Sequence, residues 1–259
     1  MGRTTKKNKE FVSQGETITQ HFRTTKKRST SNRFGGLTED DLAKRGLRDL
    51  LKDDLDLVFV GINPGFAAAH TGRYYSNPTN HFWRALYMSG LIPAPLSSQD
   101  DEKLLDLGIG LTDICPRVTQ KAKDLSTAEI REGAAKLREK MGRHRPKVVV
   151  FMGKKIYEIY SGEKNFVFGR QRTPMFEPSE GREATHIWVM PSTSSRCAQI
   201  PRAVDKVPFF AALKTFLAYL KGEAPEPEEC EVTFASVVLG NVHKKIKVEV
   251  EDRGEEENG

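Results

Sequence analysis

Short apolar runs that alternate with helical patterns constrain the fold of this chain more than any other feature of its sequence. Leu57–Ile62 is a continuous apolar run that ends in Asn-Pro-Gly, which is typical of a buried strand entering a turn. Further strands are expected at Gly108–Ile114, Lys147–Met152 and His186–Met190. Because helical stretches separate these runs, we predict an α/β fold, a three-layer α/β/α sandwich with a mostly parallel central sheet.

The stretches between the strands carry helix signals. Asn77-Pro78 predicts the start of a helix that runs to about Gly90, with Phe82 and Trp83 as core residues. Ser126 is expected to cap the next helix, with a capping box completed by the glutamate three residues later. Another helix is expected from Gly153, and an amphipathic one at Ala203–Lys221.

The charges divide the chain into three parts. Residues 1–35 carry nine Lys or Arg and two Glu, a net charge of +7, and we predict a basic disordered arm there. Residues 222–259 are Pro- and Glu-rich with a net charge of −7, and we predict an acidic mobile tail. The folded domain is expected at residues 36–221, which keep a net charge of +6. A basic arm on a basic domain favours a nucleic-acid partner, although a solvated charged tail would look the same.

Composition excludes several classes of protein. The cysteines at positions 115, 197 and 230 are odd in number and widely spaced, so we expect neither a disulfide framework nor a metal site. No apolar stretch follows the polar amino terminus, so neither a secretory signal nor a membrane span is expected. Lys6-Lys7 and Lys26-Lys27-Arg28 are typical of import signals or a DNA-holding arm, and we expect a soluble protein of the nucleus.

Two loops at the carboxyl ends of the predicted strands carry the candidate chemistry. Ligands of such folds bind beyond that edge of the sheet. Gly61–Gly65 follows a buried strand but lacks the Gly-Lys-Ser/Thr ending of a phosphate-binding loop, and Gly153-Lys154-Lys155 lacks the earlier glycine. Two tyrosines and an asparagine within Gly72–Asn80 suit an aromatic pocket around a planar base.

The second loop, Met190–Pro201, is rich in hydroxyl groups and follows the last predicted strand. Its serines and threonine offer donors to phosphates. The arginine behind them is suited to enter a duplex, and the glutamine to contact a base edge. A plain Ser/Thr linker would explain the polar half of the loop but not its Met-Pro entry or its Arg-Cys-Ala-Gln exit.

Together, Gly61–Gly65, Asn77–Trp83 and Met190–Lys206 closely resemble the thymine-DNA glycosylase, or mismatch-specific uracil-DNA glycosylase, family. The resemblance covers about residues 35–221 and is nearer the eukaryotic branch, because Arg196 stands where bacterial members have Leu. It also includes Lys123–Ser126, Arg131–Gly133 and Ile156–Ile159.

This resemblance implies a uracil-DNA glycosylase-like sandwich with monofunctional activity. Such an enzyme hydrolyses the N-glycosidic bond of uracil or thymine mispaired with guanine in double-stranded DNA, which starts base excision repair. The resemblance further implies neither metal nor organic cofactor, and we expect a monomer. The preferred base stays open among thymine, uracil, hydroxymethyluracil, etheno-cytosine and hypoxanthine.

The resemblance also assigns roles to individual positions. Asn63 matches the residue that positions the hydrolytic water, and its neutral amide can orient a water but cannot take a proton. Three positions depart from the pattern: Tyr74 replaces a His of vertebrate members, and Asp113 and Met152 replace Asn residues. The base pocket is assigned to Ile62, Ala68, Tyr74, Tyr75, Asn80 and Asp113. The DNA contacts are assigned to Lys123, Lys154, Ser192, Ser194, Arg196, Gln199 and Pro201.

Two other classes of protein compete with this prediction. A catalytically silent DNA-binding or regulatory protein could keep the same scaffold, although the retained Asn63 argues against it. A nucleotide-binding enzyme with a similar sheet is disfavoured because the phosphate-loop motif is missing.

Short motifs in the terminal parts suggest further partners. Thr17–Phe22 resembles a sliding-clamp-binding peptide, but Gly15 stands where that pattern has Gln. Ile246–Glu249 fits the hydrophobic-Lys-x-Glu acceptor pattern for a small ubiquitin-like modifier, with Lys247 as the acceptor. Val237–Leu239 is suited to pair with that modifier as a strand, although a solvated charged strand is the plainer interpretation of this tail.

Overall fold

The structure is a computed structural model, and it describes residues 34–235. Contacts along the chain separate residues 1–36 from residues 37–259, and the fold described here belongs to the second unit. The expected clamp-binding peptide, the import signals and Lys247 lie outside the described residues. Within residues 34–235, no helix is long and apolar enough to cross a membrane.

A six-stranded sheet in the order β2-β1-β3-β5-β4-β6 forms the centre of this unit. β1 (Leu57–Gly61), β2 (Ile109–Asp113), β3 (Val148–Met152) and β5 (His186–Met190) are parallel to one another. β4 (Phe168–Arg170) runs antiparallel to β5, and the two-residue β6 (Thr233–Phe234) runs antiparallel to β4. The predicted mostly parallel sheet is therefore confirmed, with an antiparallel edge that the sequence did not reveal.

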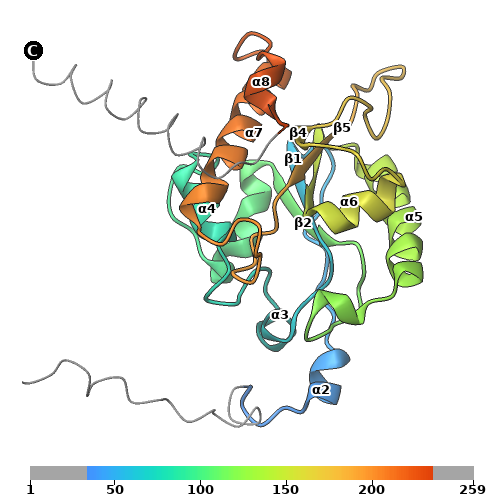
Figure 1. The fold of residues 1–259 in the computed structure, drawn as a ribbon, viewed down its shortest axis with the longest axis vertical. Coiled ribbons are helices and arrows are strands. Elements are labelled where there is room, and N and C mark those ends of the chain that lie inside the picture. The colour runs from blue at the N-terminus through green and yellow to red at the C-terminus, as the bar shows by residue number, and fades with distance from the viewer. Residues whose placement is uncertain (1–33, 236–259) are drawn as a thin grey trace, which may run out of the picture. The chain divides into compact units, whose positions relative to one another are not determined.

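Helices cover both faces of the sheet (Figure 1). α4 (Phe82–Met88) and α7 (Val207–Leu220) lie on one face, and α5 (Thr127–His144) and α6 (Lys154–Ser161) lie on the other. The predicted α/β/α sandwich is thus confirmed. The remaining helical elements are short: α2 (Glu39–Ala43), α3 (Phe66–Thr71), α8 (Glu229–Val232) and the 3-10 helices η2 (Ser98–Leu107), η3 (Ala122–Asp124) and η4 (Val204–Lys206).

The core explains why these segments form strands and helices. Every residue of β1 and β3 is buried, as expected for parallel strands covered on both faces. Phe59 of β1 packs edge-on against Phe82 of α4 and stacks on Phe210 of α7, which joins that helix layer to the sheet. On the opposite face, α5 begins with the predicted capping box, in which Ser126 accepts from the backbone of Glu129.

Two predicted boundaries are wrong. α4 begins at Phe82 rather than at Asn77, because the Asn77 Oδ1 accepts from the backbone N–H of Thr79 and so forms a turn instead. The amphipathic helix expected at Ala203–Lys221 is split into the 3-10 turn η4 and α7.

The expected acidic tail begins with ordered structure. α8 and β6 lie within residues 222–235, where the sequence predicted a mobile segment. Val232 is fully buried, and the ring of Phe234 lies 4.3 Å from that of Phe209 on α7. Burial of these apolar residues offsets the conformational entropy lost when the segment becomes ordered, although its acids and prolines had suggested disorder.

Candidate active site

The carboxyl ends of the four parallel strands bring the candidate residues to one edge of the sheet. Asp113 is the last residue of β2 and pairs with Gly61, the last residue of β1. Asn63 follows β1 by two residues, and Ser192 follows β5 by the same interval. The loop after β3 lies against the loop after β5, since a side chain built on Gly153 would contact that of Ser192. The parallel strands therefore bring the two predicted loops to the same edge of the sheet, as expected.

The side chain of Asn63 is held by a distant segment. Its Nδ2 donates to the carbonyl of Arg117 at 2.7 Å and to the Oγ1 of Thr119 at 2.8 Å. The carbonyl of Pro64, at 3.2 Å, is a third acceptor. The Thr119 hydroxyl donates its own proton to the carbonyl of Lys121, which leaves its oxygen free to accept from Asn63.

These partners fix which end of the amide faces outward. Two of the three are backbone carbonyls, which can only accept, so the nitrogen of Asn63 must face them. The Oδ1 is thereby left as the acceptor that can orient a water. Because an amide stays neutral, Asn63 can align a nucleophile without acting as a general base.

Asp113 and Tyr75 flank the same point of the backbone. A Cβ built on Gly61 would lie 2.2 Å from the Oδ1 of Asp113 and 3.7 Å from the hydroxyl of Tyr75. Glycine at this position therefore gives the carboxyl its space. The Oδ2 of Asp113 is buried and has no hydrogen-bond partner within residues 34–235. A buried polar atom of this kind is available for a hydrogen bond to a ligand at this edge of the sheet.

Burial, helped by the charge of Asp49 and opposed by that of Lys140, raises the pKa of Asp113 to about 7. Asp49 is held beside the strand because it accepts from Thr112 and pairs with Lys140. Near neutral pH the Asp113 carboxyl is thus divided between its neutral and ionised forms. The neutral form can both donate and accept, as the Asn expected at this position would.

Tyr75 takes an unusual backbone conformation. Its φ of 51° lies in the left-handed region that non-glycine residues seldom adopt. Its ring stacks on Phe82, with ring centroids 3.9 Å apart and planes inclined by 18°. This stacking holds the aromatic ring beside the end of β1, where the sequence predicted a wall of the base pocket.

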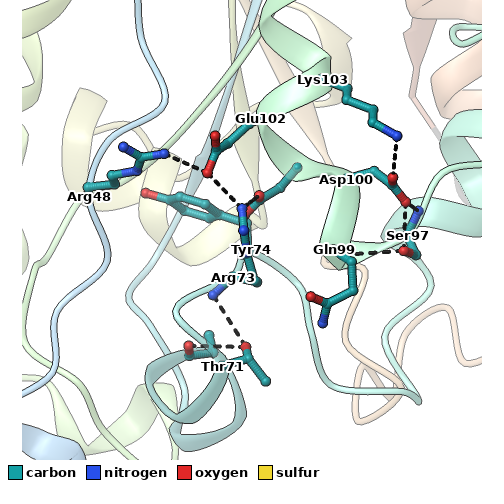
Figure 2. Close-up of polar contacts among 11 residues, drawn as sticks. Arg48, Thr71, Arg73, Tyr74, Ser97, Gln99, Asp100, Glu102 and Lys103 are labelled. Carbon is teal, nitrogen blue, oxygen red and sulfur yellow. Dashed lines mark hydrogen bonds and ion pairs between the residues drawn. The ribbon is translucent and has the colours of Figure 1, made fainter.

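An acidic pair from η2 anchors the segment before Tyr75 (Figure 2). Arg73 contacts Asp101 at 2.6 Å and Glu102 at 2.8 Å, and the backbone N–H of Tyr74 donates to Asp101 at 3.1 Å. The phenol of Tyr74 is only 4% exposed and belongs to the hydrophobic core. Tyr74 therefore packs into the core behind this segment, whereas Tyr75 is partly exposed.

The other predicted pocket residues, Ile62, Ala68 and Asn80, lie between β1 and α4. Ile62 is partly buried against the core, and Ala68 is buried in α3. The Oδ1 of Asn80 accepts from the N–H of Phe82, which forms an Asx turn at the entry to α4. Met152, where the family pattern has Asn, is buried beside Met190 and suits this apolar position.

Residues 191–201 form a loop that we call the wedge loop. Within it, Ser192 accepts from the backbone N–H of Ser194, and Ser194 accepts from that of Arg196. These two turns use hydroxyl lone pairs and leave both hydroxyl protons available to phosphates. The predicted DNA-contacting residues Arg196, Gln199 and Pro201 are exposed.

Contacts join the wedge loop to the segment of residues 77–81. The backbone N–H of His81 donates to the carbonyl of Thr193 at 3.0 Å, and the hydroxyl of Ser195 donates to that of Thr79 at 2.9 Å. The segment that carries Asn80 and the loop that carries Arg196 therefore form one continuous surface.

The two predicted phosphate-binding lysines differ in their surroundings. Lys123 is exposed in η3. The ammonium of Lys154, at the start of α6, lies 5.3 Å from the ring centre of Phe166 and 5.6 Å from that of Phe168. Lys154 is also exposed, and its role in phosphate binding stays a prediction.

Several residues that shape the site could not be identified from the sequence. Thr119 and Arg117 lie more than fifty positions from Asn63. Lys206 is fully buried and contacts both His81 and the wedge loop. Among residues 34–235, no group of three or more His, Cys, Asp or Glu side chains is placed to hold a metal ion.

A family model of the Uracil DNA glycosylase superfamily matches residues 48–220. The match spans the whole parallel sheet and both candidate loops, and the chain belongs to this superfamily. The protein is accordingly a DNA glycosylase, a hydrolase of N-glycosyl bonds whose superfamily acts on uracil-type lesions in DNA.

Proposed function

We propose that this chain is a monofunctional, mismatch-specific glycosylase that releases uracil or thymine paired with guanine, within the thymine-DNA glycosylase branch of the superfamily. The orientation of Asn63 is the observation that carries the proposal. Three acceptors bind its Nδ2 and turn its Oδ1 outward at the carboxyl edge of the sheet. A residue held in this way suits water alignment and not proton abstraction.

The geometry supports a reaction in which bond breaking leads. The bond between C1′ and the base nitrogen breaks, and its electron pair leaves with the base as an anion. The sugar then carries oxocarbenium character, and the oxygen of the water held by Asn63 adds to C1′. The water loses its proton to solvent, since no carboxylate replaces the amide at this position. Positioning therefore supplies a large share of the acceleration.

The pocket for the extruded base is proposed between Tyr75, Asp113 and Ile62. The ring of Tyr75 offers a planar apolar surface, held by Phe82 behind it. The unpartnered Oδ2 of Asp113 offers a hydrogen bond to the edge of the base. In its neutral form this carboxyl also spares the departing base anion a full negative charge.

The wedge loop is proposed to hold the DNA. Hydroxyl protons of Ser192 and Ser194 suit phosphate oxygens, and the exposed Arg196 suits the space that the extruded base leaves. Gln199 and Pro201, exposed on the same loop, suit contacts to the unpaired guanine. Extrusion costs least for a mispaired base, which favours mismatches.

Base release from defined duplexes tests this function. The full chain is incubated with duplexes that hold uracil, thymine, hydroxymethyluracil, etheno-cytosine or hypoxanthine opposite guanine, and abasic sites are then cleaved with alkali. We expect release of uracil and thymine, and less release from matched A·U and A·T pairs. Tight binding without any release from these duplexes would instead support the silent DNA-binding protein.

A further inference from the structure

Lys206, the last residue of η4 and the N-cap of α7, is an unusual core residue. Lys206 is 0% exposed and ranks among the largest fully buried side chains of the described residues. Burial lowers the pKa of its ammonium, while the nearby Cys197 and Asp205 raise it. Removing an ammonium from water costs several kcal/mol, which only well-placed acceptors offset.

The acceptors of Lys206 come from both sides of the candidate DNA surface. Its Nζ lies 3.1 Å from the carbonyl of Ser194 in the wedge loop and 3.0 Å from the Nδ1 of His81. The Ser194 carbonyl also accepts from the N–H of Cys197, which closes the turn around Arg196. His81 directly follows Asn80 and precedes the first residue of α4.

The contact with Lys206 also defines the state of His81. An ammonium can only donate, so the Nδ1 of His81 must accept and its ring proton must be on Nε2. Burial lowers the pKa of His81, and the charges of Lys206 and Arg84 lower it further. His81 is therefore neutral, and the bond from Lys206 fixes the direction of its ring.

Stability alone does not account for a lysine at this place. Replacing a buried charged group by an apolar one of similar volume is often neutral or stabilising. Methionine would fill the space without the cost of desolvation. What methionine cannot do is hold the Ser194 carbonyl and the His81 ring at a fixed separation.

We propose that Lys206 is a positioning residue for base extrusion, which sets the wedge loop against the segment of residues 77–81. The inference rests on the proposed function. It adds Lys206 as the residue that holds the wedge loop and the segment of residues 77–81 in a fixed relative position. Lys206 acts through Ser194 and His81 and touches neither base nor phosphate.

The test compares Lys206→Met with Lys214→Met, which removes an exposed lysine from α7. Extrusion is measured as the fluorescence of 2-aminopurine placed beside an uncleavable 2′-fluoro uracil opposite guanine, at saturating protein. We expect Lys206→Met to lose more than half of the fluorescence rise and to release uracil from the cleavable G·U duplex at least tenfold more slowly. Its affinity for DNA should change less than threefold and its melting temperature should not fall.

The matched variants sharpen this result. Lys214→Met should equal the wild type in both assays, and Lys206→Arg should regain part of the fluorescence rise because it keeps the charge and the donors. A full fluorescence rise in Lys206→Met would overturn the proposal. If that variant does not fold, His81→Ala removes one of the two acceptors at a partly exposed residue, and an unchanged rise would be equally decisive.

The proposal and the proposed function can fail separately. The fluorescence assay uses a base that cannot be released, so it reports on Lys206 even if the wild type has no activity. A wild type that releases no base from any cleavable duplex would contradict the proposed function. An active wild type with normal extrusion in Lys206→Met would contradict only the role of Lys206.

Discussion

The loop that carries Asn63 and the wedge loop lie at the same edge of the sheet but are held in different ways. Residues 61–65 are tied to the distant segment 113–119 by backbone bonds from Cys115 to Ile62 and from Thr119 to Pro64, and by the Asn63 side chain. Residues 191–201 are held by two internal serine turns, by two hydrogen bonds to residues 77–81 and by one from Lys206.

This difference matches the demands of the two tasks. A water that attacks C1′ must be aligned within a fraction of an ångström, so the aligning amide needs partners that cannot move. A loop that follows a flexible duplex needs exposed side chains on a well-placed backbone. Substitutions in the first loop should therefore change the chemical step, whereas those in the wedge loop should change extrusion and grip.

Asn63→Ala should have the largest effect. Removing the aligning amide should slow single-turnover release of uracil from a G·U duplex by about 10²–10³-fold, while binding of the same DNA stays within about threefold. Rapid-quench measurement of base release and fluorescence anisotropy of binding give the two values. Asn165→Ala, which alters an exposed asparagine, serves as the control and should be silent. A loss below about tenfold in Asn63→Ala would falsify its role.

Asp113→Asn should change the pH dependence of base release. With the pKa of Asp113 raised to about 7, the neutral carboxyl is present below that pH and is lost as the pH rises through it. The wild-type rate should therefore fall between pH 6 and 8, and at pH 8 the Asn variant should be about tenfold faster, since its amide does not titrate. It should also reorder the preferred bases.

Stability gives an independent check on Asp113. A raised carboxyl pKa means that the folded state binds its proton more tightly than the unfolded state does. The wild type should then lose stability as the pH rises from about 4 to 7, and Asp113→Asn should lack this loss. Asp106→Asn, at an exposed position, is the control for charge. Identical rate and melting profiles for wild type and Asp113→Asn would remove Asp113 from the chemistry.

Arg196→Ala tests the wedge loop. Thymine carries a methyl group that hinders entry to the pocket. A side chain that fills the space left in the base stack therefore matters more for thymine than for uracil. We expect about a tenfold loss on G·T pairs and about a threefold loss on G·U pairs, measured as single-turnover rates. Arg172→Ala removes an exposed arginine between β4 and β5 and should affect both pairs equally. Equal losses on the two pairs in Arg196→Ala would contradict a wedge.

Much of the sheet was predictable because its strands are continuous apolar runs. β1 and β3 stand out for this reason, and Ser126 with Glu129 marks the start of α5. The start of α4 was not predictable, because the side chain of Asn77 closes a turn that the Asn-Pro signal does not distinguish from a helix cap. β6 exists only through pairing with β4, which local sequence cannot reveal.

The site was predictable as a set of positions but not as an arrangement. The resemblance identified Asn63 and Asp113. Nothing in the sequence shows that Thr119 orients Asn63, or that Asp49 lies close enough to Asp113 to raise its pKa. Lys206 looks like one more solvated lysine in a basic chain, and only the fold shows that it is buried. Contacts between residues far apart in sequence depend on the assembled sheet.

Thr119→Val should have a much smaller effect than Asn63→Ala and most directly tests how the first loop works. Valine keeps the shape of threonine but cannot accept the hydrogen bond from Asn63, whose bonds to the carbonyls of Arg117 and Pro64 remain. One intramolecular hydrogen bond contributes about 1 kcal/mol, so the rate of the chemical step should fall about fivefold. Affinity for DNA should be unchanged, and Thr119→Ser, which keeps the hydroxyl, should restore the rate. If Thr119→Val instead weakened DNA binding and left single-turnover release intact, the contrast between a loop built for chemistry and a loop built for grip would be wrong.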